Sequence, residues 1–222
     1  MQKVVVVTVH PDDETLMCGG TLLKHHYLGD EINWLIITNV SEKFGWNIEF
    51  INKRQVEIGK VANFYGFNRI IKLDFPTTQL DTIPRGDLIS KISDVFKTIK
   101  PEIIYLPNKS DVHSDHQITF EAAYSCTKSF RYPFIRKVLM GETLSESEFG
   151  PALKGETFNP NVFVDITDYI DKKKEIMRVY ESEVMEPPFP RSMENIEALA
   201  RYRGARAGVH FAEAFELLYE KA

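Results

Sequence analysis

The chain has 222 residues, of which 43% are hydrophobic and 27% are charged, a composition typical of a globular protein with one core of ordinary size. Its 27 basic and 32 acidic residues give a formal net charge of −5, which argues against a broad surface for nucleic acid or an anionic membrane. No apolar run approaches the roughly 20 residues that span a bilayer, and Cys18 and Cys126 are too few for a disulfide framework, so we expect a reduced, cytoplasmic protein with a single domain over residues 1–222.

Four short runs of apolar, mostly β-branched residues predict strands in the first half of the chain, at residues 4–9, 32–37, 69–73 and 103–106. Apolar residues at helical spacing predict helices between and after these runs, over residues 51–65, 88–99 and 119–130. Because strand and helix alternate, the crossovers should be right-handed. The pattern therefore predicts an α/β fold, a single-domain, Rossmann-like, doubly wound and mostly parallel sheet with helices on both faces.

The second half of the chain is less regular. It predicts strands at residues 134–140 and 161–166 and helices at residues 171–183 and 193–206. Residues 141–160 are polar and acidic without a period, and a segment of that length is more often functional than a simple connection. We expect this loop to border a pocket or a subunit contact; the alternative is a solvated surface loop.

Two polar clusters follow the first and fourth predicted strands. Residues 10–14 read His-Pro-Asp-Asp-Glu, where a dinucleotide-binding protein would carry a glycine-rich turn, so a nicotinamide or flavin cofactor is not expected. Residues 107–116 contain His113, Asp115 and His116. In a doubly wound sheet, ligands bind beyond the carboxyl ends of the strands, which is where both clusters should lie.

The residue types in these clusters are those of a catalytic zinc site. Two histidines and one carboxylate are a common set that leaves a position open for water. The adjacent Asp12 and Asp13 can supply one metal ligand and one general base. A lone histidine at a strand end is usually an ordinary polar residue, and aspartate is a common helix cap. The presence of histidine in both clusters nevertheless favours a metal site over these ordinary roles.

The remaining histidines and cysteines do not belong to a comparable cluster of histidines and carboxylates. His25 and His26 are expected on a helix surface, and the position of His210 stays open. Cys126 falls on a helix stripe and should be buried in the core, and Cys18 should be buried as well, although it is close enough to the first cluster to be a ligand.

The sequence resembles the LmbE-like, or PIG-L-type, zinc-dependent N-acetylglucosamine deacetylases. The resemblance rests on a His-Pro-Asp-Asp-Glu box at residues 10–14 and a His-x-Asp-His box at residues 113–116. Further matches lie at Arg54 with Glu57, at residues 161–167, and between residues 203 and 215. The resemblance therefore spans nearly the whole chain in a consistent order.

The resemblance implies one Zn²⁺ per chain, bound by His10, Asp13 and His116. It also implies Asp12 as the general base and His113 as the group that stabilises the oxyanion or protonates the leaving amine. Asp115 would orient His113. Glu14 would support the ligands without binding the metal, and Arg54 would reach the substrate.

Two positions depart from the family pattern. Residues 75–78 read Phe-Pro-Thr-Thr where many members carry an aspartate that contacts a sugar hydroxyl. His210 and Phe211 stand where a tyrosine is frequent. The resemblance therefore implies the family's chemistry with different sugar contacts.

The expected function is a zinc-dependent hydrolase that removes the N-acetyl group from an amino-sugar conjugate of the N-acetylglucosamine type and releases acetate. Its partner would be that small molecule, without nucleic acid or an integral membrane segment, and with a possible homo-oligomer. The alternatives are a metallo-phosphoesterase, which usually needs two metals, and a non-catalytic zinc protein. Arg54, on the buried stripe of its helix, either pairs internally, with Glu57 or a box carboxylate, or points into the pocket.

Overall fold

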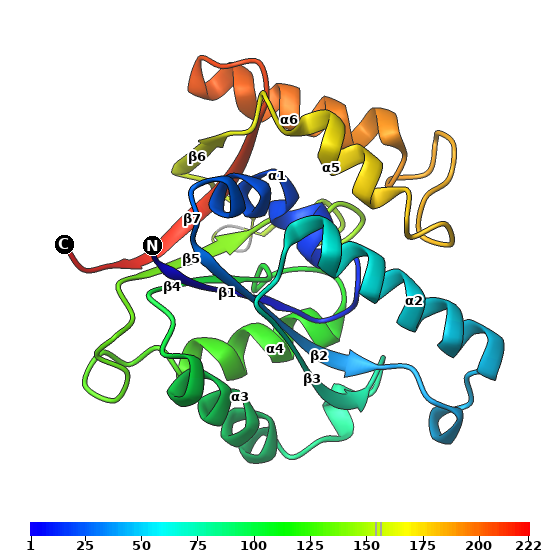
Figure 1. Ribbon diagram of the computed structural model, residues 1–222, viewed down its shortest axis with the longest axis vertical. Helices are drawn as coiled ribbons and strands as arrows, with labels where there is room; N and C mark the ends of the chain where they lie inside the picture. The colour runs from blue at the N-terminus through cyan, green and yellow to red at the C-terminus, as the bar shows by residue number, and fades with distance from the viewer. Residues whose placement is uncertain (154, 156) are drawn as a thin grey trace.

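The computed structural model describes residues 1–153, 155 and 157–222, and it contains one seven-stranded sheet in the order β3-β2-β1-β4-β5-β7-β6 (Figure 1). The first five of these strands in sequence are parallel: β1 (Lys3–Thr8), β2 (Glu31–Asn39), β3 (Arg69–Pro76), β4 (Ile103–Leu106) and β5 (Lys137–Gly141). Strand β7 (Ala212–Glu220) pairs antiparallel with both β5 and β6 (Val162–Asp165). The expected α/β fold with a mostly parallel sheet is therefore confirmed.

Helices cover both faces of the sheet (Figure 1). They are α1 (Asp13–Tyr27), α2 (Ile48–Tyr65), α3 (Arg85–Ile99), α4 (Ser114–Ser125), α5 (Ile170–Met177) and α6 (Met193–Ala207), with short 3₁₀ turns η1 (Glu42–Phe44) and η2 (Leu80–Thr82). Alternate residues of β1 point to opposite faces. Val4 and Val6 pack with α1, α2, α5 and α6, whereas Val5 and Val7 pack with α3 and α4. Within the described part of the chain, no helix is both long and apolar enough to cross a bilayer.

The order of the strands reverses between β1 and β4. The chain runs outward from β1 through β2 to β3 and then returns to place β4 on the other side of β1. A reversal of this kind opens a crevice at the carboxyl ends of the two central strands. The two sequence clusters follow these two strands, so the topology brings them together.

Strand β7 is absent from the sequence-based expectation. Residues 212–220 read Ala-Glu-Ala-Phe-Glu-Leu-Leu-Tyr-Glu, which is rich in helix-forming residues. Pairing on both sides, with β5 and β6, overrides that local preference.

Three predicted elements extend at one end well beyond the bounds that the structure gives them. The helix expected at 171–183 ends at Met177, after which the chain continues in turns to Glu183. The helix expected to reach residue 130 ends at Ser125, and Phe130 is 77% exposed. The strand expected at 134–140 begins at Lys137. In each case the apolar pattern in the sequence continues past the helix or strand, because apolar residues also occur in the adjoining turns or on the surface.

The expectation that His25 lies on the helix surface is wrong. The His25 side chain is only 12% exposed because its Nδ1 contacts Asp30 Oδ2 at 2.8 Å and its Nε2 contacts the Tyr105 hydroxyl at 2.9 Å. His26 and His210 are exposed. Cys18 and Cys126 are both buried, as expected.

Candidate active site

The first box forms the turn between β1 and α1. Asp13 begins α1, and its Oδ2 accepts hydrogen bonds from the backbone amides of Val9 at 2.9 Å and His10 at 2.8 Å. Burial alone would raise the pKa of Asp13, but the neighbouring His116 and His10 lower it below its usual value. The turn therefore holds an ionised carboxylate at the carboxyl end of β1.

The second box brings two histidines to the same place from the start of α4. Single donor atoms of His10, Asp13 and His116 all lie within 4.8 Å of one another, so these three side chains can hold a metal ion. Across the two boxes, His116 Nε2 lies 3.5 Å from Asp13 Oδ1. The structure thus brings together the three residues that the sequence singled out as ligands.

The environment of His116 fits a bound cation. Its Nδ1 contacts Asp111 Oδ2 at 2.8 Å, while its buried Nε2 has no hydrogen-bond partner among the residues that the structure describes. Burial opposes the charged ring, but Asp13 and Asp111 raise the pKa of His116 to about 9. A histidine that donates to a carboxylate and presents its other nitrogen is the usual arrangement of a metal ligand.

Asp111 was not identified from the sequence. Its two oxygens contact His116 Nδ1 and, at 2.6 Å, the Ser147 hydroxyl. The contact with Ser147 ties the 141–160 loop to the site. An aspartate five residues before His116 was the available signal, but spacing alone does not show which carboxylate faces the ring.

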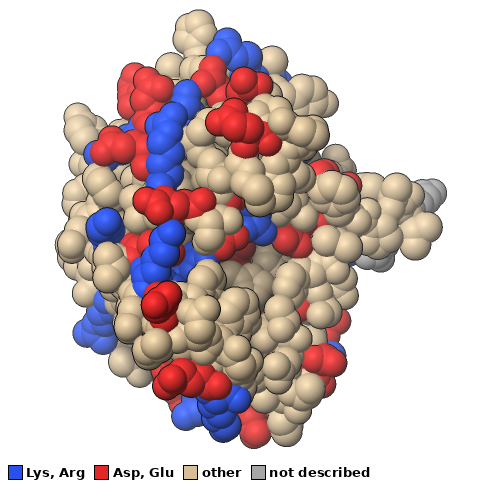
Figure 2. All heavy atoms as spheres, turned by 90° about the vertical axis from the view of Figure 1, so that its right-hand side faces the viewer, with Lys and Arg blue, Asp and Glu red and all other residues tan. Residues whose placement is uncertain are grey.

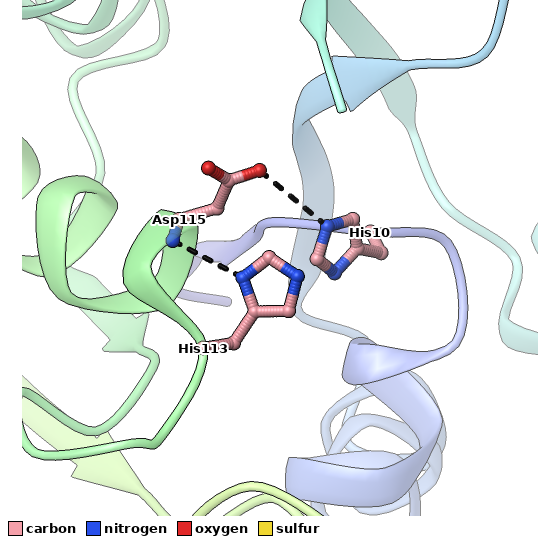
Figure 3. Close-up of side chains that lie close together, drawn as sticks. All are labelled: His10, His113 and Asp115. Carbon is pink, nitrogen blue, oxygen red and sulfur yellow. Dashed lines mark hydrogen bonds and ion pairs between the residues drawn. The ribbon is translucent and has the colours of Figure 1, made fainter. Parts of the chain in front are cut away.

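His113 lies beside His10, with their ring centroids 4.8 Å apart (Figure 3). Its Nδ1 accepts a hydrogen bond of 3.1 Å from the backbone amide of Asp115, so a neutral ring must carry its proton on Nε2. Burial, followed by the nearby His10 and His116, lowers the pKa of His113 to about 4. The neutral ring is therefore a hydrogen-bond donor through Nε2.

The Asp115 carboxylate makes different contacts from its amide. Its oxygens accept hydrogen bonds from the backbone amides of Thr78, at 2.7 Å, and Leu80, at 3.1 Å, and Oδ2 lies 3.8 Å from His10 Nε2 (Figure 3). His10, His113 and Asp115 form a second group whose donor atoms lie within 4.8 Å. The two groups share His10, whose Nδ1 lies 4.0 Å from Asp13 Oδ2 and whose Nε2 faces Asp115.

Asp12 is buried next to these groups and is not a member of either. Burial raises its pKa well above the usual range and the charge of Asp13 adds to this, whereas Arg191 opposes it. Asp12 Oδ2 accepts a hydrogen bond of 2.8 Å from Arg191. Asp12 is thus a separate carboxylate that an arginine holds in place.

Glu14 supports the turn from inside the core. Its Oε2 accepts a hydrogen bond of 3.0 Å from the Asp12 amide, and its Oε1 accepts one of 2.9 Å from the Tyr180 hydroxyl and one of 2.7 Å from the Thr15 hydroxyl. Burial raises the pKa of Glu14 to about 7. Both oxygens of Glu14 therefore accept hydrogen bonds from within the protein.

Arg54 is buried, lines the cavity and is paired within the protein. Its guanidinium contacts Glu57 Oε2 at 3.4 Å and the Pro11 carbonyl oxygen at 3.1 Å, and it also pairs with Glu183. Arg54 therefore pairs with carboxylates of the protein and also lines the cavity, so both alternatives that the sequence left open are realised. The pairing with Glu183 was not anticipated, because that residue lies 129 positions away.

Arg191 was also missed, because it lies in an aperiodic segment between α5 and α6. It contacts Glu183 Oε2 at 3.1 Å and Glu146 Oε1 at 3.2 Å in addition to Asp12, and its Nε donates to the Ser145 hydroxyl at 2.6 Å. It therefore joins the first box to the 141–160 loop. In that loop, residues 154 and 156 lie outside the described part of the chain.

These groups surround a cavity of about 210 Å³. The two boxes contribute His10, Asp12 and His113, and a wall of ion pairs contains Arg54, Glu146, Glu183 and Arg191. Thr77 and Thr78 also line it, at the position where the family pattern has an aspartate, and so do Trp46 and Phe50. Figure 2 looks onto this edge of the sheet, where acidic and basic side chains gather around a hollow in the surface.

Fold and site together define an α/β protein with a His-His-Asp group, able to hold a metal ion, at the switch point of its sheet. The PIG-L family model, described as GlcNAc-PI de-N-acetylase, matches residues 5–127, more than half of the chain. The chain belongs to this family.

Similar proteins carry related names. The chain is 24% identical to diacetylchitobiose deacetylase of Thermococcus kodakarensis, over 98% of this chain and 84% of that protein. It is 23% identical to the probable N-acetyl-alpha-D-glucosaminyl L-malate deacetylase 2 of Bacillus anthracis, over 82% and 81%. The solved N,N'-diacetylchitobiose deacetylase of Pyrococcus horikoshii has a TM-score of 0.77 at 21% identity, over 98% of this chain and 84% of that one, which shows a shared fold.

Proposed function

We propose that the protein is a cytoplasmic, zinc-dependent hydrolase that removes the acetyl group from an N-acetylated amino sugar and releases acetate. The family and the names of the relatives support an N-deacetylase. The observation that carries the proposal is the buried Nε2 of His116, which has no hydrogen-bond partner among the described residues and lies near Asp13. Asp12 and His113 are not members of the group formed by His10, Asp13 and His116, so both are available for proton transfer. A shared fold alone would not decide the chemistry.

The donor set of His10, Asp13 and His116 suits one zinc ion per chain. Two imidazole nitrogens and one carboxylate oxygen leave a fourth position open, as in catalytic zinc sites. Bound there, zinc would supply a Lewis acid that polarises a carbonyl and lowers the pKa of a water molecule. We favour this group over the second one because both Asp115 oxygens and His113 Nδ1 already accept backbone hydrogen bonds.

Asp12 and His113 divide the proton transfers. Asp12 takes a proton from the water that attacks the acetyl carbonyl carbon, and Arg191 keeps the carboxylate oriented for this step. The Nε2–H of His113 donates a hydrogen bond to the acetyl oxygen as negative charge develops there. When the carbon–nitrogen bond breaks, Asp12 passes the proton that it took from water to the leaving nitrogen, and the acetyl group leaves as acetate.

Three further residues hold this arrangement together. Glu14 fixes the Asp12 amide, and the Asp115 amide fixes the ring of His113. Arg54 contributes to substrate binding by holding the Pro11 carbonyl and Glu183 at the cavity wall. The phosphoesterase alternative has less support, because such enzymes usually need two metals and both oxygens of Asp115, in the second group, already accept backbone hydrogen bonds.

Acetate release from N-acetylglucosamine conjugates tests the proposal. We expect the zinc-loaded protein to release acetate and a chelator to abolish the release. Asp12→Asn should lower turnover by about 10²–10⁴-fold, because it removes the base, while the zinc content stays at about one per chain. Asp87→Asn, which changes an exposed carboxylate of α3, is the control.

Two results would count against this assignment. Near-full activity of Asp12→Asn would mean that another group is the base. No acetate from any conjugate with the zinc-loaded protein would reject the N-deacetylase function itself.

A further inference from the structure

A short turn opens the 141–160 loop and lies against the segment before α4. The amides of Glu146 and Ser147 donate to the Thr143 carbonyl at 3.1 and 2.9 Å, and the Thr143 amide donates to the Ser147 hydroxyl at 2.8 Å. The Val112 amide donates to the Glu146 carbonyl at 3.1 Å. These contacts fix the position of Ser147.

The hydroxyl of Ser147 can donate in one direction only. Its oxygen accepts the hydrogen bond from the Thr143 amide and lies 2.6 Å from Asp111 Oδ1. A hydroxyl has a single proton, and a carboxylate oxygen can only accept. The Ser147 hydroxyl therefore donates its proton to Asp111.

Asp111 passes this orientation on to His116. The Asp111 side chain is fully buried, and its Oδ2 lies 2.8 Å from His116 Nδ1. Because that oxygen accepts, the proton on Nδ1 points at Asp111, and a neutral His116 ring presents the lone pair of Nε2. Nε2 has no hydrogen-bond partner among the described residues and lies 3.5 Å from Asp13 Oδ1. Ser147, Asp111 and His116 thus form one series of hydrogen bonds that ends at the proposed metal ligands.

The turn has other contacts that keep it in place. The Val112 amide joins it to the segment before α4, and Arg191 contacts Glu146 at 3.2 Å. Removal of the Ser147 hydroxyl would leave a buried oxygen of Asp111 without this donor, which is costly. The carboxylate would then be less firmly held against the histidine ring.

We propose that Ser147 is a positioning residue for the metal: its hydroxyl orients Asp111, Asp111 fixes the ring of His116, and the affinity for zinc depends on this series. The proposal rests on the zinc-dependent function proposed above. Loss of a group that contacts a ligand, and not the metal, typically lowers metal affinity or activity by about 10–100-fold. Ser147 lies outside residues 5–127, which the family model matches, so this contribution comes from the second half of the chain.

The affinity for zinc, measured on the full chain by competition with a chelator of known affinity, tests the proposal. Ser147→Ala should weaken zinc binding by about tenfold or more, and Ser147→Thr, which keeps a hydroxyl, should restore most of the loss. Ser125→Ala is the matched control, because Ser125 is also half-buried and its hydroxyl donates to the Ala122 carbonyl within α4, at 2.7 Å. This control should leave the zinc affinity unchanged.

A double-mutant cycle shows whether Ser147 acts through Asp111. If it does, adding Ser147→Ala to Asp111→Ala should change the zinc affinity less than about twofold, because the residue that transmits the effect is already missing. A loss as large as in the unmodified background would overturn the proposal.

The zinc measurements also separate this proposal from the proposed function. Unchanged zinc affinity of Ser147→Ala would overturn the role of Ser147, and a lower melting temperature of the zinc-free variant would then show that Ser147 only stabilises the loop. No zinc binding by the unmodified protein would instead reject the metal site, and with it the zinc-dependent function.

Discussion

At the scale of single residues, Asp12 is held by contacts from three directions. Its φ of 133° is unusual for a residue other than glycine. The Asp12 amide donates to Glu14, its carbonyl oxygen accepts from the amides of Thr15 and Leu16 at 3.0 Å each, and its carboxylate accepts from Arg191. The surrounding structure thus fixes a strained backbone at the proposed general base, as is common in active sites.

Arg191 should matter more for turnover than for substrate binding. Arg191→Ala should lower kcat about tenfold or more with a small change in KM, because hydrogen bonds to charged groups are worth about 1.5–3 kcal/mol. Arg191→Lys should restore part of the loss, since a lysine keeps the charge without the planar set of donors. The measurements are kcat, KM and zinc content.

Arg201→Ala is the control for Arg191, because Arg201 is 64% exposed and pairs with Glu197 on the surface of α6. If Arg191→Ala lowered the melting temperature strongly and left kcat unchanged, Arg191 would only tie the loops together.

At the scale of elements, α1 is two helical segments joined at Cys18, which has φ −146° and ψ 25°. The break frees backbone groups that need partners. Glu213 on β7 accepts hydrogen bonds from the amides of Gly20, at 2.8 Å, and Thr21, at 2.7 Å. Lys173 on α5 donates to the Leu16 carbonyl at 3.0 Å and pairs with Glu213 at 2.7 Å. The break therefore depends on a buried ion pair from two other elements.

Glu213→Gln should destabilise the protein by about 3–5 kcal/mol, because it leaves the buried charge of Lys173 without its partner. The measurement is the free energy of unfolding in urea. Glu175→Gln, which alters the exposed pair with Lys172 on the same helix as Lys173, should change stability by about 0.5 kcal/mol or less. A cost for Glu213→Gln as small as that of this control would mean that water or other groups replace the carboxylate.

At the scale of the whole molecule, the two edges of the parallel sheet serve different purposes. The carboxyl ends of β1 and β4 carry the cavity. At the opposite edge, His25 contacts both Asp30 and Tyr105. Asp30 Oδ1 also accepts a hydrogen bond of 2.7 Å from the Gln2 amide. This cluster joins the start of the chain, the end of α1 and β4, and we expect it to affect stability without affecting the reaction.

The stabilisation from Asp30 should depend on pH. Burial tends to raise its pKa, but the hydrogen bonds of His25 and the Gln2 amide lower it below the usual value. A lowered pKa in the folded state means that the ionised carboxylate stabilises the fold above the unfolded pKa of about 3.9, and that this contribution is lost as the pH falls through the folded value.

Asp30→Asn should therefore cost about 1 kcal/mol at pH 7, and the difference from the unmodified protein should shrink below about pH 4. Thermal unfolding at a series of pH values measures this, and acetate release should be unchanged. A constant difference over the whole series would show that the charge of Asp30 is not the cause.

The sequence by itself determined the alternating architecture and the two boxes. The strands near β1, β2, β3 and β4 follow from local apolar patterns, and the histidines and aspartates follow from short spacings after two of them. These signals depend on neighbours a few residues apart, so they can be read without a fold. The family resemblance depends on the same short segments, and the match to residues 5–127 confirms it.

Only the tertiary structure decided the partners of the charged groups. Arg191 and Asp12 are 179 positions apart, and the pairing of Arg54 with Glu183 spans 129. Asp111 is close to His116 in sequence, yet only the turn before α4 shows that it faces the ring. Strand β7 likewise has helix-forming residues and becomes a strand through its two neighbours. The partner of a charged side chain or of a strand is a residue that the fold brings next to it from elsewhere in the chain. Local sequence patterns therefore cannot identify that partner.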